Sequence, residues 1–273
     1  MGKFDGILIC TDLDGTLYKK DKTISEENKT AIEYFKREGG LFTFITGRMP
    51  YYSLDAYSKA RPNAPFGCIN GGGVYDGENQ RYVWTADMPD GVMELVESVD
   101  RAIDDVGIQV CAFLRTYFCR ENDRMVSFRR QTGLPKLSCH YREVNEPIGK
   151  ILFGTESEEC IFAIEKILRS HPRADEFDFI RSERTLFEIL PKGVHKGLAL
   201  SKIAEHLGLD KRKTIAVGDY NNDIGMFRTA GVGIAVSNAC PAALEAADLV
   251  TVSNEEHAIA RIIYDIESGK ISL

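Results

Sequence analysis

The stretch TIAVGDYNNDIGMFRTAGVGIAV, residues 214–236, indicates the fold class of the chain. Its apolar run at 214–217 predicts a buried strand, the pattern at 222–229 predicts a helix, and the run at 232–236 predicts a second strand. Two strands joined by a helix pair in parallel, with a right-handed crossover. The stretch therefore predicts part of an open α/β sheet, in which ligands bind beyond the carboxyl ends of the strands.

Strands and helices alternate in the same way toward both ends of the chain. The further strands that we expect here cover residues 6–13, 41–45, 66–70, 81–84 and 248–252. Thr23 and Glu26 have the spacing of a capping box, and the helix after them is expected to end before Gly39. The other expected helices cover residues 50–60, 196–207, 241–246 and 255–266.

The middle of the chain has a different pattern. Helices are expected at residues 89–106 and 157–170, and strands at 108–114, 117–119, 150–154, 177–181 and 185–190, whereas 121–149 stays unassigned. Neighbouring strands are typical of an α+β module with antiparallel pairing. We therefore expect a doubly wound, mostly parallel (Rossmann-like) α/β core at residues 1–83 and 191–273, interrupted by an inserted α+β domain at 84–190.

The composition excludes several classes of protein. Of the 273 residues, 44% are hydrophobic and 27% are charged, so the chain can bury a sizeable core. The net charge of −7 opposes a broad nucleic-acid surface, which needs clustered basic residues. No apolar run approaches the roughly 20 residues of a membrane helix. We therefore expect no nucleic-acid partner and no membrane span.

The pattern of cysteines indicates the cellular compartment of the protein. All 7 are scattered along the chain and none forms a C-x-x-C pair, which is typical of reduced thiols in a cytosolic protein. The apolar run at residues 7–10 is too short for a secretory signal. We therefore expect a cytoplasmic protein, either a monomer or a weak homo-oligomer.

Unusual polar sequences follow several of the predicted strands. DLDGT covers residues 12–16, TGR covers 46–48 and GDYNND covers 218–223, while Lys196 begins a predicted helix. Taken singly, such residues are usually turn formers, helix caps or solvated lysines. Together, in this order and at carboxyl strand ends, they indicate a phosphoryl-transfer site.

Four carboxylates are expected at this rim of the sheet, those of Asp12, Asp14, Asp219 and Asp223. Like charges a few ångström apart repel one another, so a cation must offset them. Oxygen ligands and a phosphate-bearing substrate favour Mg2+, and Lys196 adds a further positive charge. Backbone amides at Gly15 and Gly47 and the hydroxyl of Thr46 could bind the phosphate oxygens.

The chain resembles the haloacid dehalogenase-like phosphatase superfamily in four motifs: DLDGT at 12–16, ITGR at 45–48, Lys196 and GDYNND at 218–223. The inserted domain resembles the class II cap of the Cof-type (IIB) subfamily. Asn70 with the glycine after it, and the run FEILP at 187–191, resemble that subfamily too. The resemblance covers the whole chain and implies a Mg2+ cofactor and a small phosphorylated metabolite as substrate.

The resemblance implies roles for three residues of the first two motifs. Asp12 matches the nucleophile that becomes an aspartyl-phosphate. Asp14 matches the general acid/base, which protonates the leaving oxygen and then activates water. Neighbouring carboxylates are expected to raise the pKa of Asp14, as acid chemistry requires. Thr46 matches the hydroxyl that orients the phosphoryl oxygens.

Lys196 matches the cation that holds the nucleophile and the phosphate together. Lys192 is a nearby alternative, but the spacing of the family favours Lys196. Further contacts with substrate or phosphate are expected from Gly15, Gly47, Arg48 and Asn70.

The resemblance also implies a set of metal ligands. The expected ligands of Mg2+ are Asp12, Asp14 through its main-chain carbonyl, and Asp219. Asp223 matches either a direct ligand or one that acts through the outer sphere. Asn222 would steady this loop, although Asn221 beside it leaves that assignment open by one position.

The function favoured by the resemblance is a Mg2+-dependent phosphatase of small phosphorylated metabolites, sugar phosphates foremost. A phosphomutase with the same aspartyl-phosphate is one alternative. A non-catalytic sensor of phosphorylated metabolites is another, against which Asp14 argues because binding alone needs no acid/base. Selectivity is expected in the cap, where the candidates are Arg115, Arg120 and Arg184. Tyr18 departs from the smaller apolar residues of the family and would either narrow the entrance or have no effect.

Overall fold

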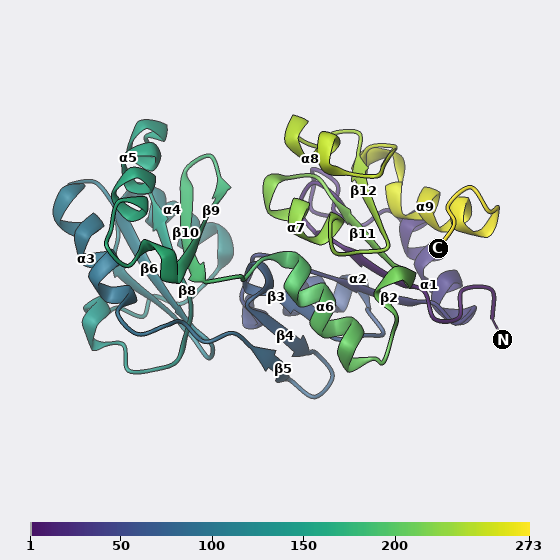
Figure 1. Cartoon of the computed structure of the whole chain (residues 1–273), viewed down its shortest axis with the longest axis horizontal. Coiled ribbons are helices and arrows are strands. Elements are labelled where there is room, and N and C mark those ends of the chain that lie inside the picture. The colour runs from purple at the N-terminus through teal and green to yellow at the C-terminus, as the bar shows by residue number, and fades with distance from the viewer. Residues whose placement is uncertain (1) are drawn as a thin grey trace. The chain divides into compact units, whose positions relative to one another are not determined.

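The computed structural model describes residues 2–273, which form two compact units. The first unit contains residues 2–48, 53–84 and 195–273. The second contains residues 49–52 and 85–194. Each has its own sheet and its own apolar core, so the two are described separately (Figure 1).

The first unit is built on a five-stranded sheet in which every neighbouring pair is parallel. Its strands are β1 (Leu8–Thr11), β2 (Leu41–Phe44), β11 (Thr214–Gly218), β12 (Val232–Val236) and β13 (Leu249–Thr251). They lie in the order β13-β12-β11-β1-β2. This arrangement confirms the predicted doubly wound α/β core.

The strand order reverses between β1 and β11. From β1 the chain continues to β2 on one side, whereas from β11 it continues to β12 and β13 on the other. Connections that leave in opposite directions open a crevice at the carboxyl ends of the two central strands. Asp12 follows β1 directly and Asp219 follows β11 directly, so both residues lie at this switch point.

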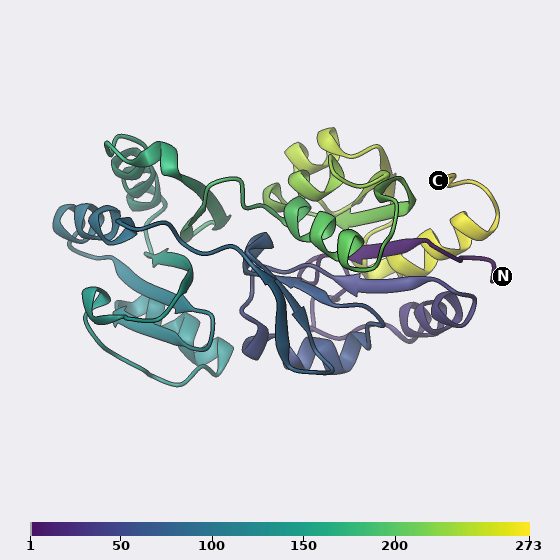
Figure 2. The same cartoon turned by 60° about the horizontal axis from the view of Figure 1, so that its bottom comes forward.

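Helices cover both faces of the parallel sheet. On one face α1 (Glu26–Arg37) packs against α9 (Ala258–Glu267), and Figure 2 shows them in purple and yellow on the same side of the sheet. The other face carries α6 (Lys196–His206), α7 (Ile224–Phe227) and α8 (Pro241–Ala246). Burial on both faces explains why the strands are almost continuously apolar.

A second, antiparallel sheet in this unit corrects one prediction. It consists of β3 (Phe66–Cys68), β4 (Gly73–Asp76) and β5 (Arg81–Thr85), with α6 packed against β3 and β4. The predicted strand over 66–70 ends two residues early, at Cys68. Ile69 and Asn70 have left-handed backbone angles, with φ values of 58° and 50°, which a strand cannot contain.

The second unit is the predicted α+β module. Its antiparallel sheet has the order β7-β6-β8-β10-β9 and consists of β6 (Gly107–Ala112), β7 (Thr116–Arg120), β8 (Ile148–Gly154), β9 (Phe177–Glu183) and β10 (Leu186–Pro191). Helices α3 (Val92–Ala102) and α5 (Glu158–Arg169) pack against each other. Their apolar side chains form one core with those of the sheet.

The unassigned region 121–149 contains helix α4 (Asp123–Thr132). The side chain of Asn122 caps its first turn by accepting a hydrogen bond from the Met125 amide at 3.0 Å. Gly133, with a φ of 67°, ends it. Seven of its ten residues are polar, so the apolar periodicity by which helices are predicted is weak.

The start of α1 differs from the predicted capping box. Ser25, not Thr23, is the capping residue, and its hydroxyl accepts a hydrogen bond from the Asn28 amide at 3.2 Å. The amide and the hydroxyl of Thr23 instead donate to Asp21. Thr23 therefore belongs to the turn before the helix.

Several predicted helices are shorter than expected because a 3-10 turn replaces their first residues. The region 50–60 contains α2 only at Leu54–Ala60, and α9 begins only after His257, whose φ is 63°. The 3-10 turns cover Pro50–Tyr52, Ile69–Gly71, Tyr141–Glu143, Ala174–Glu176, Lys211–Lys213, Asn221–Asp223 and Asn254–Glu256.

Within residues 2–273, no helix has both the length and the apolar character that a membrane crossing requires.

Candidate active site

The loop after β1 holds Asp12 against the centre of the sheet. The Asp12 amide donates to the carbonyl of Val217 on β11 at 2.8 Å, and the Asp12 carbonyl accepts from the Leu17 amide at 3.3 Å. Gly15 makes this tight loop possible, because its φ is 82° and a Cβ there would lie 2.4 Å from Oδ2 of Asp219. The glycine of DLDGT thus allows the first and last motifs to meet.

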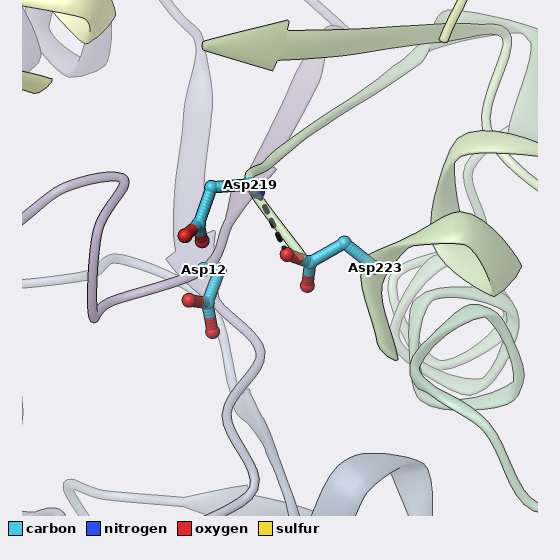
Figure 3. Close-up of side chains that lie close together, drawn as sticks. All are labelled: Asp12, Asp219 and Asp223. Carbon is cyan, nitrogen blue, oxygen red and sulfur yellow. Dashed lines mark hydrogen bonds between the residues drawn. The ribbon is translucent and has the colours of Figure 1, made fainter. Parts of the chain in front are cut away.

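The loop after β11 is organised by the buried carboxylate of Asp223. Its Oδ2 accepts hydrogen bonds from the amides of Asp219, at 2.8 Å, and Tyr220, at 3.0 Å. Figure 3 shows the first of these contacts. Asp219 is held from the other side, because the Thr16 hydroxyl donates to its Oδ1 at 3.0 Å. Both loops therefore fix the Asp219 carboxylate.

Lys196 connects these loops from the first turn of α6. Its Nζ lies 2.6 Å from Oδ1 of Asp12 and 2.6 Å from Oδ1 of Asp223, and its side chain is 1% exposed. Burial lowers the pKa of Lys196, but the two carboxylates outweigh burial and raise it above its ordinary value. The ammonium is therefore charged, and it is bonded to the carboxylates of Asp12 and Asp223. Lys192, the alternative, is 60% exposed and pairs with Asp178 in the second unit.

Three carboxylates lie close enough to share a cation. One oxygen each from Asp12, Asp219 and Asp223 lies within 4.8 Å of the others, and the three groups face one another in Figure 3. Burial raises the pKa of Asp12 well above its ordinary value; Lys196 opposes this shift and neighbouring carboxylates add to it. Burial and Asp223 raise the pKa of Asp219 to about 6. The three carboxylates outnumber the one ammonium of Lys196, so this group of side chains has an excess of negative charge. Its oxygen donors suit a hard divalent cation such as Mg2+.

Asp14 differs from its prediction. Arg48 donates to its Oδ2 at 2.6 Å and Lys22 donates to its Oδ1 at 2.8 Å. Burial acts to raise the pKa of Asp14, but Arg48 and Lys22 together outweigh burial and lower it. The expectation that nearby carboxylates raise this pKa is therefore wrong. The two cations are nearer to Asp14, and they favour its ionised form.

The second motif lies beside the first. Thr46 is 2% exposed, and its hydroxyl accepts a hydrogen bond from the Arg48 amide at 3.3 Å. A Cβ at Gly47 would lie 2.9 Å from the side chain of Asn70, so this glycine allows a close approach. The guanidinium of Arg48 lies 5.9 Å from the ring centre of Tyr18, which is 2% exposed. Tyr18 is thus a buried support beneath Arg48.

Asn70 joins the second motif to the fourth. Its amide donates to the Thr46 carbonyl at 3.1 Å, and its side-chain oxygen accepts from Asn222 at 3.1 Å. Asn221 is exposed, and its side-chain oxygen accepts from Cys240 instead. The structure therefore brings Asn222, rather than Asn221, into contact with the other predicted residues.

Sequence reasoning missed two side chains that support the site. Lys22 lies in a turn eight positions after Asp14, with no motif to mark it. Asn238 donates from its side chain to the Gly15 carbonyl at 2.8 Å and also accepts from the Asn254 amide at 3.0 Å. Its position just after β12, at the carboxyl end of a strand, is the signal that could have found it.

Known proteins resemble this chain over most of its length. The family model of the haloacid dehalogenase-like hydrolases matches residues 9–263. The chain belongs to this family. It is 28% identical to the 5-amino-6-(5-phospho-D-ribitylamino)uracil phosphatase YitU of Bacillus subtilis, over 94% of this chain and 96% of that protein. The predicted family membership is thereby confirmed.

Solved structures share the fold of this haloacid dehalogenase-like hydrolase over almost their whole length. The crystal structure of TM0651 from Thermotoga maritima has a TM-score of 0.80 and 26% identity, covering 98% of this chain and 98% of that one. The subclass IIB sugar phosphatase BT4131 has a TM-score of 0.83, covering 97% and 100% of the chains. At 21% identity the second likeness shows the fold alone.

The arginines predicted in the inserted domain of this hydrolase all have acidic neighbours there. Arg115 lies 3.0 Å from Glu146, and Arg184 lies 3.2 Å from Glu158. Arg120 lies 2.6 Å from Asp100 and also donates to main-chain carbonyls near it. These contacts give Arg120 a structural task at the end of α3, whereas Arg115 and Arg184 are exposed.

Proposed function

We propose that this haloacid dehalogenase-like hydrolase is a Mg2+-dependent phosphatase of small phosphorylated metabolites, which acts through an aspartyl-phosphate on Asp12. The observation that carries the proposal is the buried Lys196, whose ammonium binds the carboxylates of Asp12 and Asp223 at 2.6 Å. A buried cation shared by two carboxylates is costly to build for stability alone. It suits a site that must bind a phosphate dianion next to a carboxylate nucleophile.

The first half-reaction follows from the position of Asp12. Lys196 holds Oδ1 of Asp12, so Oδ2 is the oxygen that attacks phosphorus. A bond forms between this oxygen and phosphorus while the bond from phosphorus to the leaving oxygen breaks. The leaving oxygen takes the electron pair of that bond and a proton, which Asp14 would supply in its protonated form. Lys196 offsets the negative charge that gathers on the nucleophile and the phosphoryl oxygens.

In the second half-reaction Asp14 acts as the general base. Arg48 and Lys22 favour the carboxylate form of Asp14, which can take a proton from the water that attacks the phosphoryl group. The P–O bond to Asp12 then breaks, which releases free phosphate and restores the Asp12 carboxylate. To act as the acid of the first half-reaction, Asp14 must loosen its pairs with the two cations.

Mg2+ fits the residues that the site provides. We propose that Asp12 and Asp219 hold it, together with the predicted main-chain carbonyl of Asp14. Both oxygens of Asp223 already accept hydrogen bonds, so Asp223 orients Lys196 and the 219–220 amides. When bound, the ion supplies positive charge to the transferring phosphoryl group.

The substrate class rests on the phosphate and on the relatives. The curated relative YitU is named for a phosphorylated ribitylamino-uracil, and BT4131 is described as a sugar phosphatase. Both ligands are small and polyhydroxylated, so we propose sugar phosphates or related phosphorylated polyols as substrates. The seven cysteines are scattered along the chain with no C-x-x-C pair, which supports the proposed cytoplasmic location.

Release of phosphate from an aryl phosphate tests the proposal. We expect Mg2+-dependent turnover that excess EDTA abolishes, and loss of turnover in Asp12→Asn. Asp55→Asn, an exposed aspartate on α2, is the matched control and should keep its activity. A phosphomutase would return an isomerised sugar phosphate rather than free phosphate. A sensor would bind ligands without turning any of them over, and either result would contradict the proposal.

A further inference from the structure

Among residues 2–273, Lys22 is the one cation bonded to the site carboxylates that belongs to none of the predicted motifs. The site groups four carboxylates, those of Asp12, Asp14, Asp219 and Asp223. Three cations are bonded to them, namely Lys196, Arg48 and Lys22. One negative charge remains, and a bound divalent cation would turn it into one positive charge. Without Lys22 the same site would be neutral and would attract a phosphate dianion less strongly.

The turn that carries Lys22 is held in an uncommon shape. The Lys19 amide donates to the Thr23 carbonyl at 2.9 Å, and the Lys22 amide donates back to the Lys19 carbonyl at 3.0 Å. Lys22 has a φ of 62°, a left-handed conformation that costs free energy for a residue with a side chain. The neighbouring Asp21 carboxylate is bonded to Thr23. The turn thus directs the ammonium of Lys22, and not the adjacent carboxylate, to the site.

The exposure of Lys22 separates its task from that of Lys196. The Lys22 side chain is 64% exposed although its Nζ lies 2.8 Å from Oδ1 of Asp14. An exposed ion pair of this kind contributes little to stability, typically under about 1 kcal/mol. An ammonium also has three donors, and Asp14 occupies one of them. The Lys22 ammonium can therefore donate a hydrogen bond to an anion from solvent without any change in the fold.

We propose that Lys22 is a substrate-binding residue, which recruits the phosphate dianion and binds one of its oxygens beside Asp14. This inference rests on the proposed phosphatase function and deepens it. A dianion that binds Lys22 shares the ammonium with the Asp14 carboxylate and weakens that ion pair, so substrate binding and release of Asp14 from this pair are coupled. Lys22 thereby binds substrate directly and affects the transfer of the phosphoryl group only through Asp14.

Direct binding of inorganic phosphate tests this inference independently of turnover. In the presence of Mg2+, calorimetry should show that Lys22→Ala raises the Kd of phosphate about threefold to tenfold. Lys22→Arg should restore most of the affinity. Lys20→Ala is the matched control, since Lys20 is exposed in the same turn, and its Kd should match that of the unaltered protein. Added salt should shrink the difference between Lys22→Ala and the unaltered protein.

Kinetics with an aryl phosphate separate recruitment from catalysis. We expect Lys22→Ala to raise KM by a similar factor, to change kcat less than KM because Lys22 reaches the transfer step only through Asp14, and to leave the melting temperature unaltered. An unchanged Kd of phosphate in Lys22→Ala, or equal losses in Lys20→Ala, would overturn the role of Lys22. If the unaltered protein binds phosphate but turns over no substrate, the proposed function fails while the binding role of Lys22 still stands or falls on the Kd values.

Discussion

Nζ of Lys196 lies 2.6 Å from Oδ1 of Asp12, although 184 positions separate the two residues in the sequence. Both side chains are buried. The contact joins the first strand of the core to a helix that follows the inserted domain. It also opposes the rise that burial causes in the pKa of the candidate nucleophile, and the same ammonium binds Asp223.

Replacing Lys196 with methionine should abolish catalysis and destabilise the fold. The substitution keeps the length of the side chain but leaves two buried carboxylates without their cation, which costs about 3–5 kcal/mol. We expect a fall in kcat of at least about a thousandfold, consistent with the loss of a buried charge at a reacting group. Urea unfolding and phosphate release measure the two effects. Lys192→Met should change neither by much, and comparable losses there would contradict the assignment of Lys196.

Gly15→Ala should damage the site more than the fold. The added Cβ would lie 2.4 Å from Oδ2 of Asp219 on a backbone with a φ of 82°. Gly133→Ala is a control with a similar φ, 67°, but open space around its Cβ. Both variants should lose about 1 kcal/mol from backbone strain. Only Gly15→Ala should also lose Mg2+ affinity and activity, as calorimetry and phosphate release would show.

Asp223→Asn should loosen the loop after β11. The carboxylate accepts two main-chain amides and the Lys196 ammonium, whereas an amide side chain would direct its NH2 group at one of these donors. We expect the free energy of unfolding to fall by about 2–4 kcal/mol and kcat to fall with it. Asn221→Ala changes an exposed neighbour and should leave both close to their original values. If Asp223→Asn unfolds at the same urea concentration as the original protein, its organising role is refuted.

The metal-free protein should become more stable as the pH falls from 7 toward 5. The pKa of Asp219 is about 6 in the folded protein, above its ordinary value of 3.8, because of burial and Asp223. Between these two values the folded state binds more protons than the unfolded state, so its stability decreases as the pH rises. Mg2+ should reverse the trend, since it needs the ionised carboxylate. Urea unfolding at both pH values, with Mg2+ or with EDTA, measures this.

Asp219→Asn is the variant that isolates this effect. It should reduce the pH trend in EDTA, to which Asp12 with its raised pKa also contributes, and remove most of the stabilisation by Mg2+. Asp210→Asn, an exposed carboxylate, should keep both. A metal-free protein whose stability is flat between pH 5 and 7 would show that Asp219 ionises normally.

The parallel core could be predicted from the sequence because its local signals and its packing agree. Strands buried on both faces are apolar at almost every position, as in LICT at 8–11 and TIAVG at 214–218. The polar residues just beyond them then have only one edge of the sheet on which to gather. For the same reason the sequence predicts that the candidate residues Asp12 and Asp219 lie close together.

The remaining features depend on contacts that no local pattern records. Helix α4 has little apolar periodicity, and its two ends are marked only by Asn122 and Gly133. Asn70 has a left-handed backbone where the chain leaves β3, and its side chain meets Asn222, which lies 152 positions away. The lowered pKa of Asp14 results from Lys22 and Arg48, whose distance from Asp14 depends on a turn and on the pairing of β1 with β2.

The pairing of β1 with β11 has a consequence for synthesis of the protein. A ribosome makes the first two strands of the core early, but the central partner of β1 emerges only after the whole inserted domain. Until then one edge of β1 is unpaired, and such edges invite association with other chains. Until then the nascent polypeptide also lacks Lys196 and Asp219, so the candidate site around Asp12 is incomplete until β11 has been made.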